Sequence, residues 1–291
     1  MFTDDSFLRK QLAPGGAGFD IFMLRGYITG TIDRTFMHKI DIILPLYRPK
    51  PGWDEHVREN IRELRACFEG KASLRFLIVD DGSGEGAFDP AALDRVKSDA
   101  GDFEFLTYSP NRGKGYAVRY AAAQTRSDFV IYTDGDFPFG WRGVADAWSR
   151  LENGADVVMG VRDSGYSSAL SPGRKVLSSC VRLLNRALLG MPGRYLDTQA
   201  GLKGFNRRGL QAFLATKTDT FLFDTEFILI AWTHGLKIET VPLTLRPGLH
   251  FSRMGVSVMC RELGHFFRIL WKFRVLRKRV VTFDTAADEA K

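Results

Sequence analysis

The sequence has little of what a disulfide-linked or a membrane-spanning protein needs. Its 291 residues include only three cysteines, widely spaced and without a CxxC pair, so neither a disulfide framework nor a cysteine zinc site is expected. No run without a charged residue exceeds ten residues, whereas a transmembrane helix needs roughly 18 or more. With 45% hydrophobic and 26% charged residues, the chain has the composition of a globular protein.

Several binding motifs are also missing. There is no GxxxxGK[ST] loop, no GxGxxG and no HExxH, which argues against kinase-like, dinucleotide-dependent and zinc-protease activities. No recognised DNA or RNA module occurs, so no nucleic-acid partner is expected. The first residues carry acids and lack the apolar core of a secretory signal, which favours a cytoplasmic location. The net charge of +7 suits an anionic partner without naming one.

Short apolar runs alternate with segments of helical periodicity from Ile40 onward. Apolar strands that alternate with helices are typical of a mostly parallel sheet covered on both faces, so the predicted fold class is α/β with a central sheet flanked by helices. The predicted strands begin near Ile40, Leu74, Phe103, Phe129 and Ala155, with a short one ending at Phe205 and a last one over 236–247. The predicted helices cover residues 53–68, 115–125, 172–189 and 223–232.

Acidic pairs follow two of these predicted strands. Asp80 and Asp81 come directly after the second apolar run, and Asp134-Gly135-Asp136 comes after the fourth. Ligands bind beyond the carboxyl ends of parallel strands, and one or two carboxylates with substrate phosphates are a usual site for Mg²⁺ or Mn²⁺. Alternation along an extended segment would direct Asp134 and Asp136 to the same side. The simpler alternative is an acidic turn or a helix cap.

A glycine-rich turn with two cations, Asn111 to Gly115, precedes a predicted helix. Backbone amides at a helix N-terminus attract anions, so this turn is a candidate diphosphate cradle. An ordinary helix-entry turn is the alternative.

Six motifs in this order resemble one family: LPLYRP, VDDGS, NRGKGYAVRYA, YTDGD, DTQAGLKGF and FDTEF, between about Ile40 and Arg253. They resemble the inverting glycosyltransferases of family two, and within it the dolichyl-phosphate β-glucosyltransferases and related polyprenyl-phosphate hexose synthases. The resemblance implies the nucleotide-diphospho-sugar transferase (GT-A) fold and a divalent cofactor, Mg²⁺ or Mn²⁺. The sequence departs from the family where Arg48-Pro49-Lys50-Pro51 stands in place of a usual acid.

The resemblance also implies residue roles. Asp134 and Asp136 would bind the metal, and Asp197, Asp224 and Glu226 would be the catalytic acids on the acceptor side, with Asp197 the first candidate base and Asp224 the second. The residues implied in binding the nucleotide-sugar are Pro45, Tyr47, Asp80, Asp81, Lys114, Asp134, Gln199, Lys203, Arg246 and Arg253.

The implied reaction moves a hexose, glucose or mannose, with inversion from a nucleotide-diphospho-sugar such as UDP-glucose or GDP-mannose to a polyprenyl phosphate. A phosphate acceptor is already anionic near neutral pH and needs no strong base, whereas a hydroxyl acceptor needs a carboxylate to take its proton. Transfer to a saccharide or other soluble hydroxyl stays open, as does a non-catalytic protein that binds nucleotide-sugars.

Three regions are expected: a leader over 1–38, the transferase domain over 39–253, and a basic amphipathic segment over 254–291. The stretch from Arg261 to Arg279 contains seven basic residues and several aromatic residues but only one acidic residue, Glu262. Such a helix can lie on an anionic membrane, which would place the protein at the inner face of the membrane beside a lipid acceptor. A helix packed on the domain or at a homo-oligomer interface is the alternative.

Overall fold

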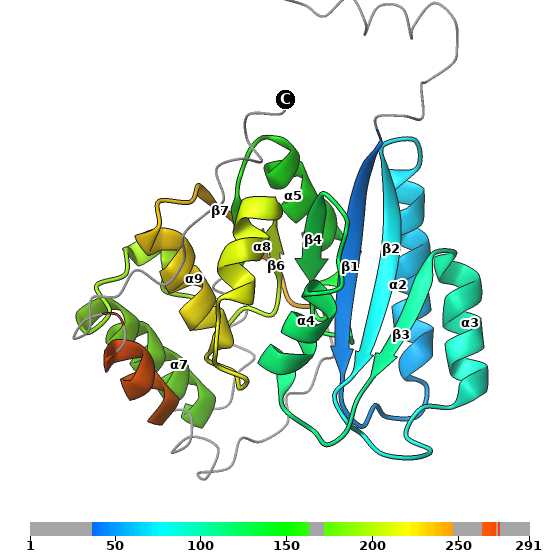
Figure 1. Cartoon of the computed structure of the whole chain (residues 1–291), viewed down its shortest axis with the longest axis horizontal. Helices are drawn as coiled ribbons and strands as arrows, with labels where there is room; N and C mark the ends of the chain where they lie inside the picture. Colours follow the sequence, from blue (N-terminus) through cyan, green and yellow to red (C-terminus); the bar gives the residue numbers. More distant parts are fainter. Residues whose placement is uncertain (1–36, 163–171, 247–263, 272, 274–291) are drawn as a thin grey trace, which may run out of the picture. The chain divides into compact units, whose positions relative to one another are not determined.

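The computed structural model describes residues 37–162, 172–246, 264–271 and 273 (Figure 1). Their elements belong to the unit His38–Lys291. The predicted leader therefore lies almost entirely outside the described residues, as do Arg253 and most of the C-terminal segment. Within the described part of the chain, no helix has the length and hydropathy of a bilayer-crossing segment.

One seven-stranded sheet forms the centre of the molecule, in the order β3-β2-β1-β4-β6-β5-β7. β6 runs antiparallel to its neighbours β4 and β5, and the other pairs are parallel. The prediction of a mostly parallel α/β sheet is confirmed. The strands are β1 (His38–Leu46), β2 (Ala72–Asp80), β3 (Phe103–Thr107), β4 (Phe129–Tyr132), β5 (Val157–Arg162), β6 (Lys203–Phe205) and β7 (Ile238–Leu243).

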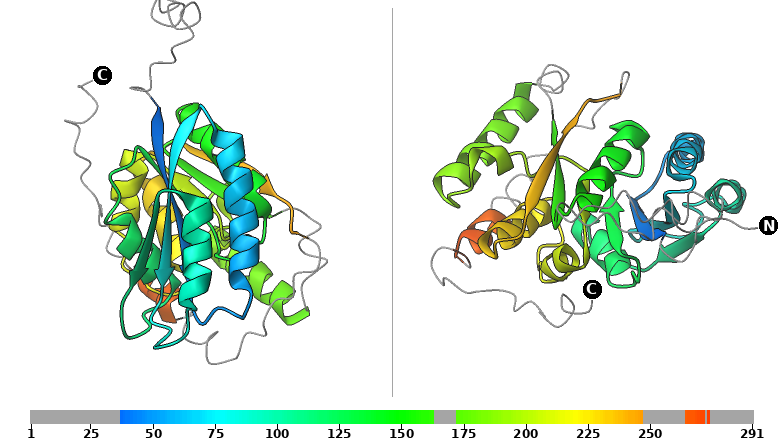
Figure 2. Two further views of the ribbon diagram at one scale, coloured as in Figure 1. Left: turned by 90° about the vertical axis from the view of Figure 1, so that its right-hand side faces the viewer. Right: turned by 90° about the horizontal axis from the view of Figure 1, so that it is seen from above.

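Helices cover both faces of this sheet (Figure 2). One face carries α2 (Trp53–Phe68), α3 (Pro90–Ala100) and α5 (Gly140–Glu152). The other carries α4 (Lys114–Ala122), α7 (Pro172–Ala187), α8 (Arg207–Leu214) and α9 (Phe223–Thr233). The predicted helices over 53–68 and 223–232 are confirmed to within a residue, whereas α3, α5 and α8 were not predicted one by one.

The first core layer follows directly from helical periodicity. Val57, Ile61 and Leu64 fall on one side of α2 and are fully buried. They pack against Ile40 and Ile42, the side chains that alternation along β1 directs to this face. Apolar burial of this kind stabilises the fold by roughly 25 cal/mol for each Å² removed from water.

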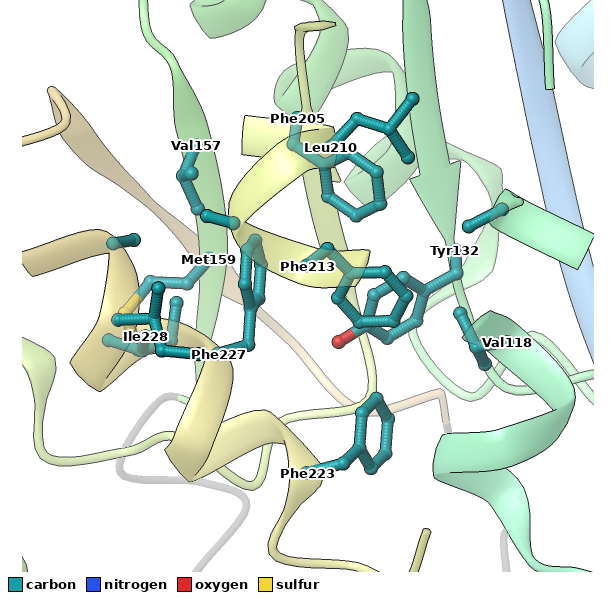
Figure 3. Close-up of a cluster of buried hydrophobic side chains, with 14 of the residues drawn as sticks. Val118, Tyr132, Val157, Met159, Phe205, Leu210, Phe213, Phe223, Phe227 and Ile228 are labelled. Carbon is teal, nitrogen blue, oxygen red and sulfur yellow. The ribbon is translucent and has the colours of Figure 1, made fainter. Parts of the chain in front are cut away.

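The second core layer surrounds Tyr132 and helix α9 (Figure 3). The Tyr132 ring lies 5.7 Å from that of Phe213 and 5.9 Å from that of Phe223, measured between centroids. α9 is apolar nearly all round and almost wholly buried, yet its first turn contains Asp224 and Glu226. Buried carboxylates need partners, so these two acids must be bonded inside the protein.

The turn after β4 differs from the prediction. The strand ends at Tyr132, and the Phe137 amide donates to the Asp134 carbonyl at 2.9 Å, with Phe137 at φ 45°. Asp134-Gly135-Asp136 is thus part of a tight turn, and the expectation that both acids project from an extended segment was wrong. The end of β1 packs closely on this turn, because a Cβ on Gly135 would lie 2.3 Å from Leu46.

Candidate active site

The loops that follow the parallel strands bring most of the predicted site residues to the carboxyl edge of the sheet. β1 leads to Tyr47, β2 to Asp81, β4 to Asp134 and β5 ends at Arg162. Tyr47 is 46% exposed, and the adjoining turn is held by a bond from the Arg48 amide to the Ser83 hydroxyl at 2.8 Å. The segments that follow β1 and β2 are therefore joined at the carboxyl edge of the sheet.

Asp81 organises the glycine-rich turn before α4. Its carboxylate accepts from the Tyr108 hydroxyl at 2.7 Å and from the amides of Arg112 and Gly113 at 2.9 and 3.0 Å. Burial and the bond to Asp81 raise the pKa of Tyr108, which keeps this hydroxyl a donor. The Arg112 guanidinium lies over the Tyr116 ring, 3.6 Å from its centroid.

Asp80 has a different role in the structure. One oxygen accepts from the Ser83 amide at 2.9 Å and the other from the Thr107 hydroxyl at 3.0 Å. The residue is 6% exposed. These bonds stabilise the turn after β2, and the role of Asp80 in binding the nucleotide-sugar stays a prediction.

Lys114, at the start of α4, reaches across to the turn after β4. Its ammonium donates to the Asp134 carboxylate at 2.5 Å. Burial opposes the charge on Lys114, but the carboxylates of Asp134 and Asp224 outweigh it and raise its pKa. A Cβ on Gly201 would lie 1.9 Å from Asp134, so the DTQAGLKGF loop packs directly on this ion pair.

Asp136 lies beside this pair and is solvent-exposed. Its pKa is raised because surrounding protein displaces part of its hydration and because Asp134 is close; the nearby charges of Arg246 and Lys114 oppose the shift. Arg246 is held by its amide, which donates to the Pro138 carbonyl at 2.9 Å. Two repelling carboxylates at an open edge fit a divalent cation. Since no three His, Cys, Asp or Glu side chains converge among the described residues, further ligands would be phosphate oxygens and water.

Lys203 joins the loop before β6 to α9. It is fully buried, and its ammonium lies 3.0 Å from the Asp224 carboxylate and 2.6 Å from the Thr198 carbonyl oxygen. Burial lowers the pKa of Lys203, and Asp224 only partly offsets that shift. The Tyr132 hydroxyl also donates to Asp224, and burial with this carboxylate raises the pKa of Tyr132. Asp224 is therefore bonded on both sides.

Arg162 holds Asp197 from the end of β5. Its backbone amide donates to one carboxylate oxygen at 2.8 Å, its Nε lies 3.0 and 3.1 Å from the two oxygens, and a terminal guanidinium nitrogen also bonds to the carboxylate. Burial alone would raise the pKa of Asp197, but these bonds outweigh burial and lower it. Sequence reasoning did not identify Arg162, although a cation at the end of a parallel strand was a usable signal.

Glu226 and Gln199 are the last two predicted site residues in this region, and both are hydrogen-bonded. The Glu226 carboxylate accepts from the amides of Lys217 and Thr218 at 2.9 and 2.8 Å, which anchors the loop before α9. The Gln199 amide donates to the Thr225 hydroxyl at 3.1 Å. The structure thus gathers most of the predicted residues at one edge, and it leaves each predicted catalytic acid already bonded to other groups.

A mostly parallel sheet with one antiparallel strand near its middle and acids at the carboxyl edge is the GT-A fold of nucleotide-diphospho-sugar transferases. Glucosyl-3-phosphoglycerate synthase from Mycobacterium tuberculosis shares this fold with a TM-score of 0.59 and 18% identity, over 92% of this chain and 87% of that one. Mannosyl-3-phosphoglycerate synthase from Rubrobacter xylanophilus gives a TM-score of 0.59 and 19% identity, over 89% and 81%.

The chain belongs to glycosyl transferase family 2, whose model matches residues 41–200. The family resemblance and the fold inferred from it are confirmed. The boundaries at residues 38 and 253 stay a prediction.

Curated relatives agree with the narrower resemblance. A dolichyl-phosphate beta-glucosyltransferase of Saccharomyces cerevisiae is 27% identical over 58% of this chain and 55% of its own length. One from Trichomonas vaginalis is 24% identical over 80% of this chain and 71% of its length. The chain thus spans little more than half of the yeast relative.

Proposed function

We propose that this protein transfers a hexose from a nucleotide-diphospho-sugar to the phosphate of a polyprenyl phosphate, with inversion and with a divalent metal at Asp134 and Asp136. The curated relatives are dolichyl-phosphate beta-glucosyltransferases, which supports glucose as the hexose and polyprenyl phosphate as the acceptor. A related structure of the mycobacterial synthase holds Mn²⁺ and UDP-glucose, which supports this donor and cofactor for the fold.

One observation carries the choice of acceptor: no predicted base is free to act as one. Asp197 is held by Arg162, Asp224 by Lys203 and Tyr132, and Glu226 by two backbone amides. A carboxylate with a lowered pKa, such as Asp197, is a weak proton acceptor. A phosphate needs no base near neutral pH, because its second pKa is about 6.

The residues on the donor side would then bind and orient the reactants. Asp81 fixes the glycine-rich turn by accepting from the amides of Arg112 and Gly113, so Lys114 beside Asp134, and not those amides, would meet a diphosphate. A divalent ion bound with the donor would offset the charge that develops on the departing diphosphate. Arg246 and Lys114 add positive charge near Asp136, where two anionic substrates must meet.

The experiment compares two acceptors that differ only in the phosphate. The full chain is incubated with UDP-glucose or GDP-mannose and Mn²⁺ or Mg²⁺, together with polyprenyl phosphate or the polyprenol of equal length in detergent. We expect a glycolipid only from the phosphate, with a rate that rises as pH passes the second phosphate pKa of about 6. Equal transfer to polyprenol or to a saccharide hydroxyl would overturn the acceptor assignment.

A pair of variants tests the donor site in the same assay. Asp136→Ala should lose metal-dependent UDP binding and transfer together, whereas Asp146→Ala, an exposed aspartate on α5, should retain both. Binding of nucleotide by the wild type without transfer to any acceptor would instead indicate a non-catalytic nucleotide-sugar-binding protein.

A further inference from the structure

The helix over residues 264–271 has one buried and one exposed face. Phe266 and Ile269 are each 2% exposed and join the core cluster that contains α9 (Figure 1, red-orange). Phe267 and Trp271 are 54% and 60% exposed, and Arg268 between them is exposed as well. The helix is therefore fixed on the domain while it presents two large aromatic side chains to solvent.

The loop that leads into α9 adjoins this helix. The Thr220 hydroxyl lies 3.2 Å from Nδ1 of His265, and the next residue in the loop, Phe221, is 48% exposed. Phe221, Phe267 and Trp271 are three of the six exposed large hydrophobic residues in the described part of the chain. Together with Arg268 they are termed the aromatic surface.

The aromatic surface is connected to the donor side of the active site through the same loop. The Asp219 carbonyl accepts from the Gly115 amide at 2.8 Å, directly after Lys114. Arg119 of α4 forms an ion pair with the Asp219 carboxylate. A Cβ on Gly113 would lie 2.6 Å from the Asp219 oxygen, so loop and turn are in tight contact. A molecule seated on the aromatic surface is thus next to the loop that packs against the glycine-rich turn before α4.

We propose that the aromatic surface seats the protein on an anionic lipid bilayer and so delivers a membrane-embedded acceptor to the carboxyl edge of the sheet. This inference rests on the proposed function for the identity of the acceptor. Large aromatics flanked by basic residues suit the boundary between head groups and acyl chains. The exposed charge in the surface is cationic, and the chain continues with Lys272, Arg274, Arg277, Lys278 and Arg279.

A second copy of this chain suits the surface less well. Most homodimers are two-fold symmetric, so the surface would have to meet itself. Arg268 would then lie against a like-charged patch, and like charges across an interface oppose association. Anionic head groups instead complement this charge.

The test is co-sedimentation of the full chain with neutral phosphatidylcholine vesicles and with vesicles that contain phosphatidylglycerol. We expect binding to the anionic vesicles that weakens with salt. Phe267→Ser with Trp271→Ser should lower the partition coefficient at least tenfold. Arg268→Gln should lower it about fivefold, the effect of one basic residue near such a surface. These side chains are exposed, so the variants should keep the circular dichroism spectrum and melting temperature of the wild type.

Two control variants make the outcome specific. Leu183→Ser removes a 64% exposed apolar side chain from α7, and Arg150→Gln removes an exposed arginine from the end of α5. Both should bind vesicles like the wild type. Equal losses from the controls, binding that is unaffected by the aromatic substitutions, or concentration-dependent dimers that the aromatic variant abolishes would overturn the proposal.

Transfer assays separate this inference from the proposed function. The aromatic variant should glycosylate a short, water-soluble prenyl phosphate at the wild-type rate, but lose transfer to polyprenyl phosphate embedded in vesicles. If the wild type binds vesicles but transfers no sugar to any prenyl phosphate, the proposed function is contradicted and the membrane-binding role of the aromatic surface is still supported. Transfer in detergent without vesicle binding would contradict the surface alone.

Discussion

Arg162 binds both carboxylate oxygens of Asp197, through its guanidinium and its own backbone amide. The two side chains are 12% and 10% exposed, so neither charge is well hydrated without the other. This pair joins the end of β5 to the loop before β6. It therefore fixes where the Asp197 carboxylate lies.

Arg162→Leu is expected to destabilise the fold by about 3 kcal/mol at pH 7, because it leaves a largely buried carboxylate unpaired. The pKa of Asp197 is lowered in the folded state, so its stabilisation exists above the unfolded pKa of about 3.9 and is lost as pH falls through the folded value. The difference in free energy of unfolding between the wild type and the variant should therefore become smaller as the pH is lowered. Urea unfolding at pH 7 and pH 3 measures this difference.

The double variant Arg162→Leu with Asp197→Asn serves as the control for that series. It removes both charges, so it should recover part of the lost stability. With the single variant Asp197→Asn added, the double-mutant cycle isolates the energy of the pair from the other contacts of Arg162. A single variant as stable as the wild type at pH 7 would contradict the importance of the pair.

Asp136→Asn is expected to stabilise the free protein while it weakens nucleotide binding. A carboxyl group with a raised folded-state pKa contributes stability at low pH, which is lost as pH rises through that pKa. At neutral pH the ionised Asp136 therefore opposes folding, and the amide does not. Thermal unfolding between pH 3 and 7 should show a higher midpoint for the variant only toward neutral pH.

The expected loss of nucleotide binding by Asp136→Asn is measured by calorimetric titration with UDP and Mn²⁺. Asp136→Asn should lose the metal-dependent part of binding, and Asp146→Asn should lose none. A variant that melts below the wild type at pH 7 would show that Asp136 stabilises the fold, against the expectation.

Gly201→Ala is expected to impair the donor site without unfolding the protein. The added Cβ would lie 1.9 Å from Asp134, so the carboxylate that Lys114 bonds must shift. Displacements of about 1 Å at a reacting centre lower turnover by up to roughly a hundredfold. Gly193→Ala, where a Cβ meets nothing within 4 Å, is the matched control. Steady-state kinetics that are equal for both variants would contradict the close packing.

Lys203→Met is expected to destabilise the protein by about 3 kcal/mol or more. The methionine fills the space but leaves the Asp224 carboxylate and the Thr198 carbonyl without their buried partner. Lys217→Met, which changes an exposed lysine, should stay within about 0.5 kcal/mol of the wild type. Guanidinium unfolding compares the two. Equal midpoints would mean that the Lys203 bonds contribute little.

The features that were predicted from the sequence are those encoded by neighbouring residues. The spacing of Val57, Ile61 and Leu64 predicts the buried face of α2, and an apolar run predicts β1. Both patterns can be read from the sequence because they involve only residues that are close along the chain. The acids after β2 and β4 could be placed at one edge because the carboxyl ends of parallel strands meet there. The ordered motifs were enough to indicate the family that the match over residues 41–200 confirms.

Only the tertiary structure determined which charges meet. Asp197 is bonded to a residue 35 positions away, Lys203 pairs with Asp224 through a helix packed behind the sheet, and the turn after β4 bends where Leu46 crowds Gly135. Such contacts depend on how strands and helices pack across long sequence separations, which periodicity and motif spacing do not encode. For this reason the sequence alone indicated the family and the edge of the sheet where the acids lie, whereas the folded structure decided that the candidate bases are already bonded.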